Sequence, residues 1–337
     1  MAPLICNIPG PLCSNKYSSL IWQRTPLYVL SVIIFIRGER VLQVCMCTMY
    51  KILHGMKERI PMNKTNATTD TADVLVSVIM PNYNGGQYLS ESVNSILKQS
   101  HKHVELIIID DASTDNSWEL ILQYANLDKR VRPFKNKGNK GILFTRNKGL
   151  SLVSKESQYI AMLDSDDIAK LQRVKKQLSF LQANPEYGIV GSHIEVIDEK
   201  SRVVNKRTYL LRDKDIKKQL YVKSPFAQPA IMVRKSVMRP YERYEVAEDL
   251  DLYFRIKSSC KFANLDEYLT QYRVTTTQSK NKKLKQTLRN TITIKSKHML
   301  EEKYFPLRAV CRLLLEAMLL LVPNKLIFWA FKKMEYR

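Results

Sequence analysis

The sequence predicts an α/β protein in which a mostly parallel sheet is covered by helices on both faces. From residue 74 onward, short runs of consecutive apolar residues alternate with longer stretches whose apolar side chains recur at helical spacing. Such a pattern is typical of buried parallel strands joined by helices. Hydrophobic residues make up 45% of the chain and charged residues 26%, which excludes a disordered chain, a collagen and a multi-pass membrane protein. The 337 residues suffice for one large domain or two smaller ones.

The expected elements follow one another in a regular order. Strands are expected at 74–80, 104–109, 131–134 and 159–163, and helices at 88–97, 115–125, 142–154 and 171–183. Right-handed crossovers place the carboxyl ends of such strands on one edge of the sheet. After residue 188 the sequence predicts a strand at 189–197 with a hairpin partner at 202–209, a helix at 213–221, a strand at 230–233, and helices at 249–258 and 280–303.

The first 73 residues do not resemble a domain. They contain an apolar run at 27–36, too short to span a bilayer, and a polar stretch at 61–73. We interpret 1–73 as a leader and linker, part of which need not belong to the native protein. The six cysteines form no C-x-x-C pair. A disulfide scaffold or a zinc site is therefore not expected. We expect a reducing, cytoplasmic location instead.

Basic charge is concentrated at the carboxyl end of the chain. The net charge is +22, and residues 270–337 hold 15 basic and 4 acidic side chains. Such an excess favours an anionic partner, namely nucleic acid, an acidic membrane surface or a phosphorylated ligand; a merely solvated basic surface is the alternative. Nucleic acid is not expected, because the basic residues are not interleaved with an aromatic stacking motif.

The stretch 307–322 predicts an amphipathic helix. Its charges at Arg308, Arg312 and Glu316 fall on one stripe, and the other faces are apolar. The favoured interpretation is a helix in a membrane interface, bound to an anionic surface. Packing onto the domain or a dimer partner is the alternative, and a true span is disfavoured by the charges and by Pro323.

Polar residues follow three of the predicted strands. Asn82 and Asn84 follow the first strand, Asp110 and Asp111 the second, and Asp164-Ser165-Asp166-Asp167 the fourth. Carboxylates crowded at one sheet edge need a cation, and their oxygens suit Mg²⁺ or Mn²⁺ shared with a diphosphate. A solvated turn with a helix cap is the alternative for the last motif.

Four motifs give the chain a resemblance to family 2 glycosyltransferases of the bacterial type that build surface polysaccharides or lipid-linked glycans. They are VSVIMPNYN at 76–84, ELIIIDDAST at 105–114, GILFTRNKG at 141–149 and YIAMLDSDD at 159–167, followed by NPEYGIVGS at 184–192 and by Glu248-Asp249. The resemblance covers 74–275 and implies a glycosyltransferase A-type fold. Residues 74–167 would be the nucleotide-binding half and 168–275 the acceptor half, with 276–337 a basic helical tail.

The resemblance assigns roles at the donor site. Pro81 and Tyr83 would pack the nucleotide base and ribose, although Tyr83 could equally be a core aromatic. Asp111 would accept the imide N–H of a uracil-type base, with Asp110 ordering the loop or exchanging roles with it. Arg146 would lie near the diphosphate, the alternative being a surface helix arginine.

The same resemblance assigns the metal and the chemistry. Asp164 would hold the ribose or a metal-bound water, and Asp166 would ligate Mn²⁺ or Mg²⁺. Asp249 would be the catalytic base, unless Glu248 and Asp249 are only helix-start acids. Arg273 would meet the leaving diphosphate as a bidentate donor.

The implied reaction is a single, inverting displacement from a nucleotide diphosphate sugar, with UDP the expected nucleotide, to a glycan or lipid-linked glycan. The chain departs from the family pattern at Lys170-Leu171, where a proline is common, and at Gln228-Pro229, where many relatives have His-Pro. Two alternatives stay open, a catalytically silent scaffold at the membrane and a nucleotidyltransferase. The latter would need a basic phosphate loop after the first strand, which the sequence lacks.

Overall fold

The computed structural model describes residues 73–275 and 283–323, all within one compact unit that spans 57–337. Apart from Asp73, the expected leader and linker lie outside the described residues, as do parts of the expected basic helical tail at 276–282 and 324–337.

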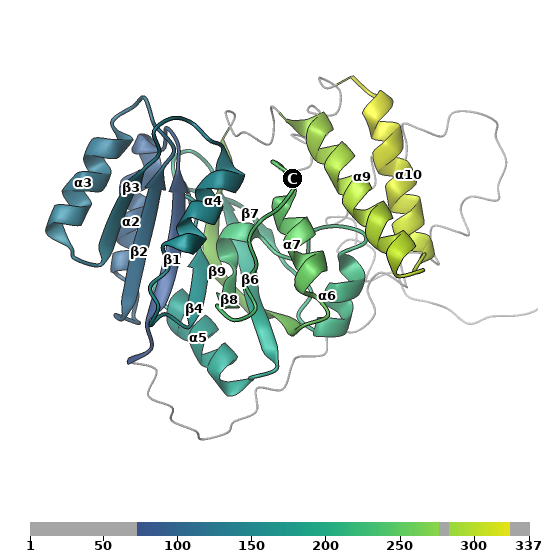
Figure 1. The fold of residues 1–337 in the computed structure, drawn as a ribbon, viewed down its shortest axis with the longest axis horizontal. Helices are drawn as coiled ribbons and strands as arrows, with labels where there is room; N and C mark the ends of the chain where they lie inside the picture. Colours follow the sequence, from purple (N-terminus) through teal and green to yellow (C-terminus); the bar gives the residue numbers. More distant parts are fainter. Residues whose placement is uncertain (1–72, 276–282, 324–337) are drawn as a thin grey trace, which may run out of the picture. The chain divides into compact units, whose positions relative to one another are not determined.

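Four parallel strands form one half of the sheet, as predicted. The elements here are β1 (Val76–Asn82), α2 (Gly86–Leu97), β2 (Val104–Asp110), α3 (Ser117–Leu127), β3 (Val131–Lys135), α4 (Ile142–Ser151) and β4 (Tyr159–Met162). The strands lie in the order β3–β2–β1–β4, and each pairs in parallel with its neighbour (Figure 1). Every residue of β1 and β2 is buried, which explains their unbroken apolar sequence.

The other half of the sheet is mixed and contains a long strand that the sequence did not predict. Its elements are β5 (Ile168–Ala169), α5 (Arg173–Ala183), β6 (Tyr187–Ile197), β7 (Val203–Arg207), α6 (Asp213–Gln219), η2 (Gln228–Ala230), β8 (Met232–Arg234), α7 (Glu248–Ile256) and β9 (Lys261–Arg273). β8 pairs antiparallel with β4 and β6, whereas β6 runs parallel to β9. The predicted hairpin of β6 and β7 is confirmed. The sequence does not predict β9 because bulges in its pairing with β6 interrupt the alternation of apolar and polar residues along the strand.

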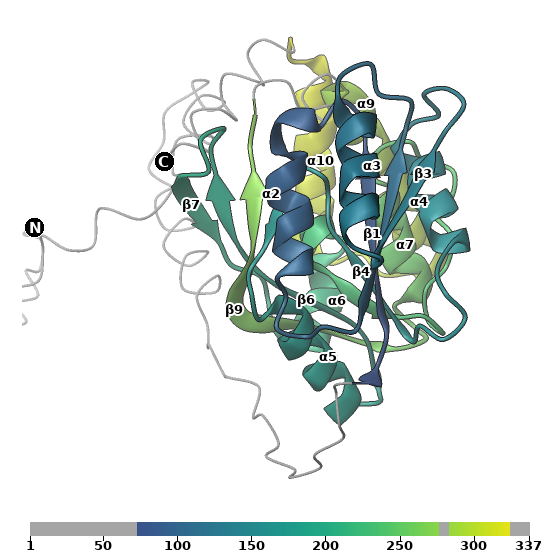
Figure 2. The same cartoon turned by 90° about the vertical axis from the view of Figure 1, so that its left-hand side faces the viewer.

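Two apolar clusters cover the two faces of the sheet. Val78 and Met80 of β1 pack with side chains of α2, α3 and α5, whereas Ile79 packs on the face that carries α7. Alternate strand residues point to opposite faces. Figure 2 shows α2 and α3 side by side on the first of these faces. The predicted arrangement, with helices on both faces, is therefore confirmed.

Gly149 lets α4 lie directly on the sheet. A Cβ atom at this position would come within 2.5 Å of Ile79 Cγ2 and 3.0 Å of Ile109 Cδ1, and both isoleucines are fully buried. The absence of a side chain therefore sets the distance between α4 and the sheet. The same helix carries Arg146, so this packing also fixes the height of Arg146 above the sheet edge.

Two further helices, α9 (Leu284–Glu301) and α10 (Leu307–Leu321), form where the sequence predicts them. Ile294 and Met299 of α9 join the apolar cluster that contains α7. Just after α9, the Glu302 carboxylate accepts hydrogen bonds from Tyr221 Oη at 2.5 Å and from Lys257 Nζ at 2.6 Å. The described part of the carboxyl-terminal region therefore packs onto the domain.

The charged stripe of α10 is divided, because Glu316 faces inward whereas Arg308 is exposed. Glu316 is buried and accepts hydrogen bonds from Lys295 Nζ of α9 at 2.9 Å and from Arg312 Nε at 2.8 Å. Ala309 is also fully buried. The sequence predicts the stripe but not the burial of Glu316, because only tertiary packing supplies Lys295 as the partner that stabilises a buried carboxylate.

Candidate active site

The sheet topology brings the polar strand ends together, as the sequence predicted. β1 lies between β2 and β4. Asn82 is in register with Asp110, and Ile79 is in register with Met162. Met162 is the last residue of β4, two positions before Asp164. The carboxyl ends of three parallel strands therefore meet at one edge, where open α/β sheets bind their ligands.

Asp110 orders the turn after β2. Its Oδ1 accepts hydrogen bonds from Asn82 Nδ2 at 2.8 Å and from Ser113 Oγ at 2.5 Å, and its Oδ2 accepts the Ser113 N–H at 3.0 Å. Ala112 adopts a left-handed φ of 59° within this turn. Such a backbone is costly for a residue with a Cβ, and the Asp110 bonds hold it in place.

Asp111 orders the neighbouring loop between β3 and α4. Its Oδ1 accepts hydrogen bonds from Asn136 Nδ2 at 2.7 Å and the Lys140 N–H at 2.9 Å, and its Oδ2 accepts the Gly141 N–H at 2.8 Å. An ionised carboxylate has about four acceptor positions. One acceptor position is therefore left for a ligand N–H after these three bonds.

Tyr83 is an exposed aromatic at this edge. Its side chain is 50% exposed, so the alternative of a core aromatic is wrong. Pro81 is buried in β1, in register with Ile109. An exposed ring that follows a buried strand end provides a flat apolar surface suited to a planar ligand ring.

Arg146 joins two carboxylates from distant parts of the chain. Its Nη2 donates to Asp164 Oδ1 at 3.0 Å, and its Nη1 donates to Glu248 Oε1. The side chain is only 7% exposed, which excludes the surface-arginine alternative. Burial would lower the pKa of this guanidinium, but Asp164 and Glu248 raise it instead, so Arg146 stays charged. It therefore acts on the site through the two carboxylates that it holds.

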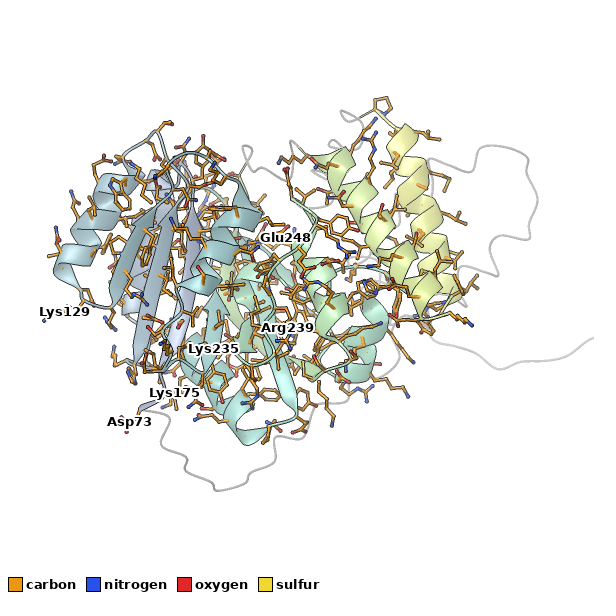
Figure 3. All side chains as sticks on the ribbon, viewed as in Figure 1. Asp73, Lys129, Lys175, Lys235, Arg239 and Glu248 are labelled. Carbon is orange, nitrogen blue, oxygen red and sulfur yellow. The ribbon has the colours of Figure 1, made fainter. Side chains whose placement is uncertain are left out.

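Glu248 and Asp249 begin α7 directly after a strained residue. Ala247 has a left-handed φ of 64°, a conformation that tertiary contacts must maintain. Burial raises the pKa of Glu248 to about 7, with Arg146 opposing the rise, and burial also raises the pKa of Asp249. Glu248 lies between α4 and the carboxyl-terminal helices (Figure 3). Of the two acids at the start of α7, Glu248 is thus held by Arg146, and Asp249 is a carboxyl with a raised pKa.

A set of hydrogen-bonded side chains behind these acids was missed by the sequence reading. Gln228 Nε2 donates to Tyr241 Oη, and Tyr253 Oη donates to Gln228 Oε1. The Arg146 guanidinium lies 5.9 Å from the centre of the Tyr241 ring. The one signal in the sequence was the replacement of histidine by Gln228; the contributions of the two tyrosines depend on tertiary packing.

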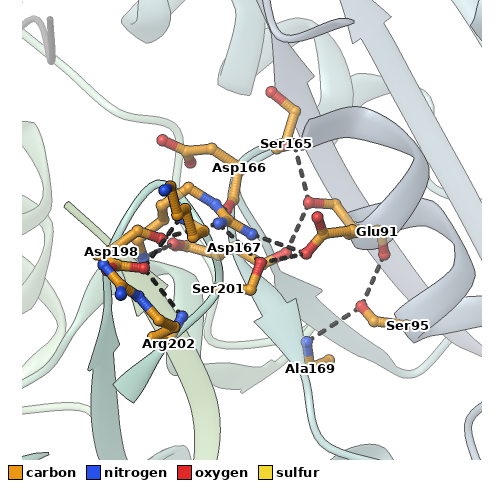
Figure 4. Close-up of polar contacts among 12 residues, drawn as sticks. Glu91, Ser95, Ser165, Asp166, Asp167, Ala169, Asp198, Ser201 and Arg202 are labelled. Carbon is orange, nitrogen blue, oxygen red and sulfur yellow. Dashed lines mark hydrogen bonds and ion pairs between the residues drawn. The ribbon is translucent and has the colours of Figure 1, made fainter. Parts of the chain in front are cut away.

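The loop from Asp164 to Asp167 is tied to α2. Ser92 Oγ lies 2.8 Å from the carbonyl oxygen of Ser165 and 2.6 Å from that of Asp167, and Ser95 Oγ accepts the Ala169 N–H at 3.0 Å. Figure 4 shows these contacts and shows the Asp166 side chain pointing away from α2. The backbone of the loop is therefore fixed from one side while the Asp166 carboxylate extends from the other.

Arg273 makes several hydrogen bonds around the Asp166 loop. It is fully buried, and its Nε donates to the Asp166 carbonyl at 2.8 Å and its Nη1 to the Asp198 carbonyl at 3.0 Å. Its Nη2 donates to Glu91 at 2.9 Å, and its backbone N–H donates to Asp167 Oδ1 at 2.7 Å. The guanidinium is therefore held by the chain itself, and its contact with a leaving diphosphate stays a prediction. The buried loop carbonyls need donors, and Arg273 supplies them as a clamp on the Asp166 loop.

The clamped loop concentrates negative charge. Burial raises the pKa of Tyr272, and Asp167, Asp166 and Asp164 raise it further. Within the described ranges, no group of three or more His, Cys, Asp or Glu side chains is placed to hold a metal ion. Mg²⁺ commonly takes one or two carboxylates and completes its shell with substrate phosphates. The residues therefore fit a divalent ion shared with a diphosphate better than one held by protein alone.

A mostly parallel sheet with carboxylates gathered at its carboxyl edge is the arrangement in which open α/β proteins bind their ligands. Residues 77–241 match the family model described as Glycosyl transferase family 2. An "Uncharacterized glycosyltransferase" of Methanocaldococcus jannaschii is 31% identical over 239 residues, which cover 68% of this chain and 81% of the relative. The chain belongs to glycosyl transferase family 2, as the motifs indicated.

Two further proteins are similar to this chain over a smaller part of its length. The "Putative teichuronic acid biosynthesis glycosyltransferase TuaG" of Bacillus subtilis is 43% identical over 107 residues, 32% of this chain and 42% of that relative. The crystal structure of S. aureus TarS 1–349 in complex with UDP-GlcNAc superposes with a TM-score of 0.52 at 18% identity, over 66% of each chain. This structural likeness confirms the expected glycosyltransferase A-type fold.

Proposed function

We propose that this protein is an inverting glycosyltransferase that moves a sugar from a nucleotide diphosphate, UDP being the expected nucleotide, to a glycan or lipid-linked glycan. The observation that carries the proposal is the buried Arg146. It bonds to Asp164 at the end of β4 and to Glu248, the neighbour of Asp249. The proposed donor-binding acid Asp164 is thereby tied to the residue that directly precedes the proposed base Asp249.

The donor would lie along the carboxyl edge of the sheet. Tyr83 and Pro81 would pack the base and ribose, and the remaining acceptor position of Asp111 would take a base N–H. Asp164, oriented by Arg146, would bind the ribose or a metal-bound water. The neighbouring fold of TarS, named as a complex with UDP-GlcNAc, supports a UDP-sugar as the donor.

Asp166 would ligate Mn²⁺ or Mg²⁺ together with the diphosphate of the donor. A bound divalent ion would supply Lewis-acid stabilisation of the charge that develops on the leaving diphosphate. The contribution of the chain itself is positional. Arg273, Ser92 and Ser95 hold the loop so that Asp166 is presented without a cost of reorganisation.

Asp249 would act as the base. It takes the proton of the acceptor hydroxyl while the hydroxyl oxygen bonds to the anomeric carbon. The bond from that carbon to the diphosphate oxygen breaks, and the diphosphate leaves with the electron pair. One such displacement inverts the anomeric configuration. The raised pKa of Asp249 supports this role, since a more basic carboxylate is a better proton acceptor.

The acceptor would belong to polysaccharide or lipid-linked glycan biosynthesis. The name of TuaG, which cites teichuronic acid biosynthesis, supports this class. We place the enzyme in the cytoplasm, at the cytoplasmic face of the inner membrane. A silent scaffold is not favoured, because the four acids that the donor site and the chemistry would use, Asp111, Asp164, Asp166 and Asp249, are all present.

The test is metal-dependent donor binding and hydrolysis by the full chain. A panel of nucleotide sugars is screened with Mn²⁺, Mg²⁺ or a chelator. We expect Asp166→Ala to weaken metal-dependent UDP binding by about 10–100-fold in calorimetry, since charge neutralisation of the diphosphate is lost.

Asp266→Ala is the matched control, because Asp266 is 63% exposed on β9; its UDP affinity should equal that of the unaltered protein. Unchanged metal-dependent affinity in Asp166→Ala would remove the metal assignment. Failure of every nucleotide sugar to bind would remove the proposed activity.

A further inference from the structure

One face of α10 exposes a row of apolar side chains. Leu307, Leu314, Met318 and Leu321 are 75%, 60%, 47% and 87% exposed, and Cys311 between them is exposed as well. Their spacing of four, three, four and three residues places all five on one side of the helix. We call these five residues the outer stripe. Leucines exposed to this extent in a continuous row are not a random feature of a folded surface.

The orientation of α10 is fixed from its opposite side. Glu316 is 3% exposed and is bonded to Lys295, itself 1% exposed, and Ala309 packs against the domain. A buried ion pair tolerates little rotation, because turning the helix would leave one charge unpaired. The outer stripe is therefore held outward and does not fold back onto the domain.

Basic side chains accompany the stripe. Lys303 and Arg308 are exposed at the turn between α9 and α10, beside the exposed apolar residues Leu300 and Phe305. Residues 283–323 hold eight basic and three acidic side chains, and one of the three acids is the buried Glu316. The surface around the stripe therefore combines exposed apolar area with positive charge.

We propose that the outer stripe of α10 docks on an anionic lipid bilayer, with the helix lying in the interface. Apolar insertion and attraction to anionic headgroups are the two contributions that such a surface gains. A second copy of this chain is the less favoured occupant, because two surfaces with the same positive excess repel. Spanning is not the mode, since no helix in the described part of the chain is long and apolar enough to cross a membrane.

The hairpin of α9 and α10 is linked to the loop that precedes α7. Asn290 Nδ2 of α9 donates to the Val246 carbonyl at 2.9 Å, and Lys283 Nζ lies 3.1 Å from Glu245. These loop residues precede Asp249 by three and four positions. Docking would thus hold the acceptor half beside the membrane, a consequence that rests on the proposed use of lipid-linked acceptors. Lipid binding by the stripe itself does not require catalysis.

The experiment is co-sedimentation of the full chain with vesicles of phosphatidylcholine alone and of phosphatidylcholine mixed with phosphatidylglycerol. Leu321→Glu is compared with Leu127→Glu at the end of α3, because the two leucines are 87% and 82% exposed and the change of charge is the same. The double variant Leu314→Glu/Leu321→Glu enlarges the effect. UDP binding and circular dichroism on the same preparations report the donor site and the fold.

We expect anionic vesicles to bind the unaltered chain and Leu127→Glu equally. The double variant should bind them at least about tenfold more weakly. High salt should weaken binding only in part, because apolar insertion is not screened.

Equal binding of the double variant and the unaltered chain to anionic vesicles would overturn the proposal and assign any membrane affinity to another segment. Equal binding to neutral vesicles would overturn the charge component. A dimer in light scattering that dissociates in the double variant, with vesicle binding unchanged, would establish the second copy instead. Loss of UDP binding with vesicle binding unchanged would count against the proposed function and would leave the lipid-docking proposal supported.

Discussion

At the residue scale, the chemistry of Asp249 is set by its surroundings. Burial raises the pKa of its carboxyl above the usual aspartate value of about 3.9. A base must be ionised to accept a proton, so transfer should fall as the pH drops through this raised pKa. We expect an acid limb in the pH profile that lies above the ordinary aspartate range.

Asp249→Asn tests this assignment while keeping the shape of the side chain. Transfer should drop by about 10²–10⁴-fold, the usual contribution of a general base, and the acid limb should disappear. Donor affinity, measured by calorimetry with UDP, should stay the same. A collapse of donor affinity, or an acid limb that persists in the variant, would make Asp249 a binding or structural residue.

At the element scale, the position of α4 depends on one glycine. The Cβ of Gly149→Ala would meet Ile79 Cγ2 at 2.5 Å and Ile109 Cδ1 at 3.0 Å, so the helix must move away from the sheet. Such overpacking costs about 1–3 kcal/mol of the free energy of unfolding, more than the gain of roughly 1 kcal/mol from replacing glycine in a helix.

Urea unfolding measures this cost. Gly138→Ala is the control, since a Cβ there meets no atom within 4 Å. Its midpoint should match or exceed that of the unaltered protein, whereas Gly149→Ala should unfold at lower urea. Weaker UDP binding should accompany the shift, because Arg146 moves with α4. An unchanged midpoint for Gly149→Ala would mean that the helix relaxes without cost.

At the scale of the whole molecule, Arg273 connects parts that are far apart in the sequence. It extends from β9 to the Asp166 loop, to Glu91 on α2 and to Asp198 after β6. Its guanidinium also lies 4.3 Å from the centre of the Tyr88 ring. Lysine keeps the charge but not the planar fork. We therefore expect Arg273→Lys to weaken metal-dependent UDP binding by about tenfold through a looser loop.

Glu91→Gln distinguishes the clamp from direct ligand binding. If Arg273 acts as a clamp, Glu91→Gln should weaken UDP binding in the same direction, and the double variant should be less than additive. If Arg273 contacts the diphosphate, Glu91→Gln should leave UDP affinity unchanged and the effects should be independent. Calorimetry with and without Mn²⁺ on the three variants decides between them.

The sequence alone determined the local structure and the residues at the sheet edge. Unbroken apolar strands, helices at regular spacing and acids placed directly after β2 and β4 are local features, because strand burial and chain direction follow from a few neighbouring residues. Tyr83 was assigned to this edge by the family resemblance with a core aromatic left open, and only the structure shows that its ring is exposed. Parallel strands must end on one edge, so the meeting of these acids needed no knowledge of long-range contacts.

Tertiary structure alone decided what the buried charges do. Arg146 meets Glu248 across 102 positions of sequence, and Arg273 meets Glu91 across 182; no local pattern encodes such pairs. β9 takes its register from β6 through bulges, and the direction of the α10 stripe follows from Lys295 on another helix. A buried charge must have its partner, and which partner it finds is settled by packing between elements that the sequence does not place side by side.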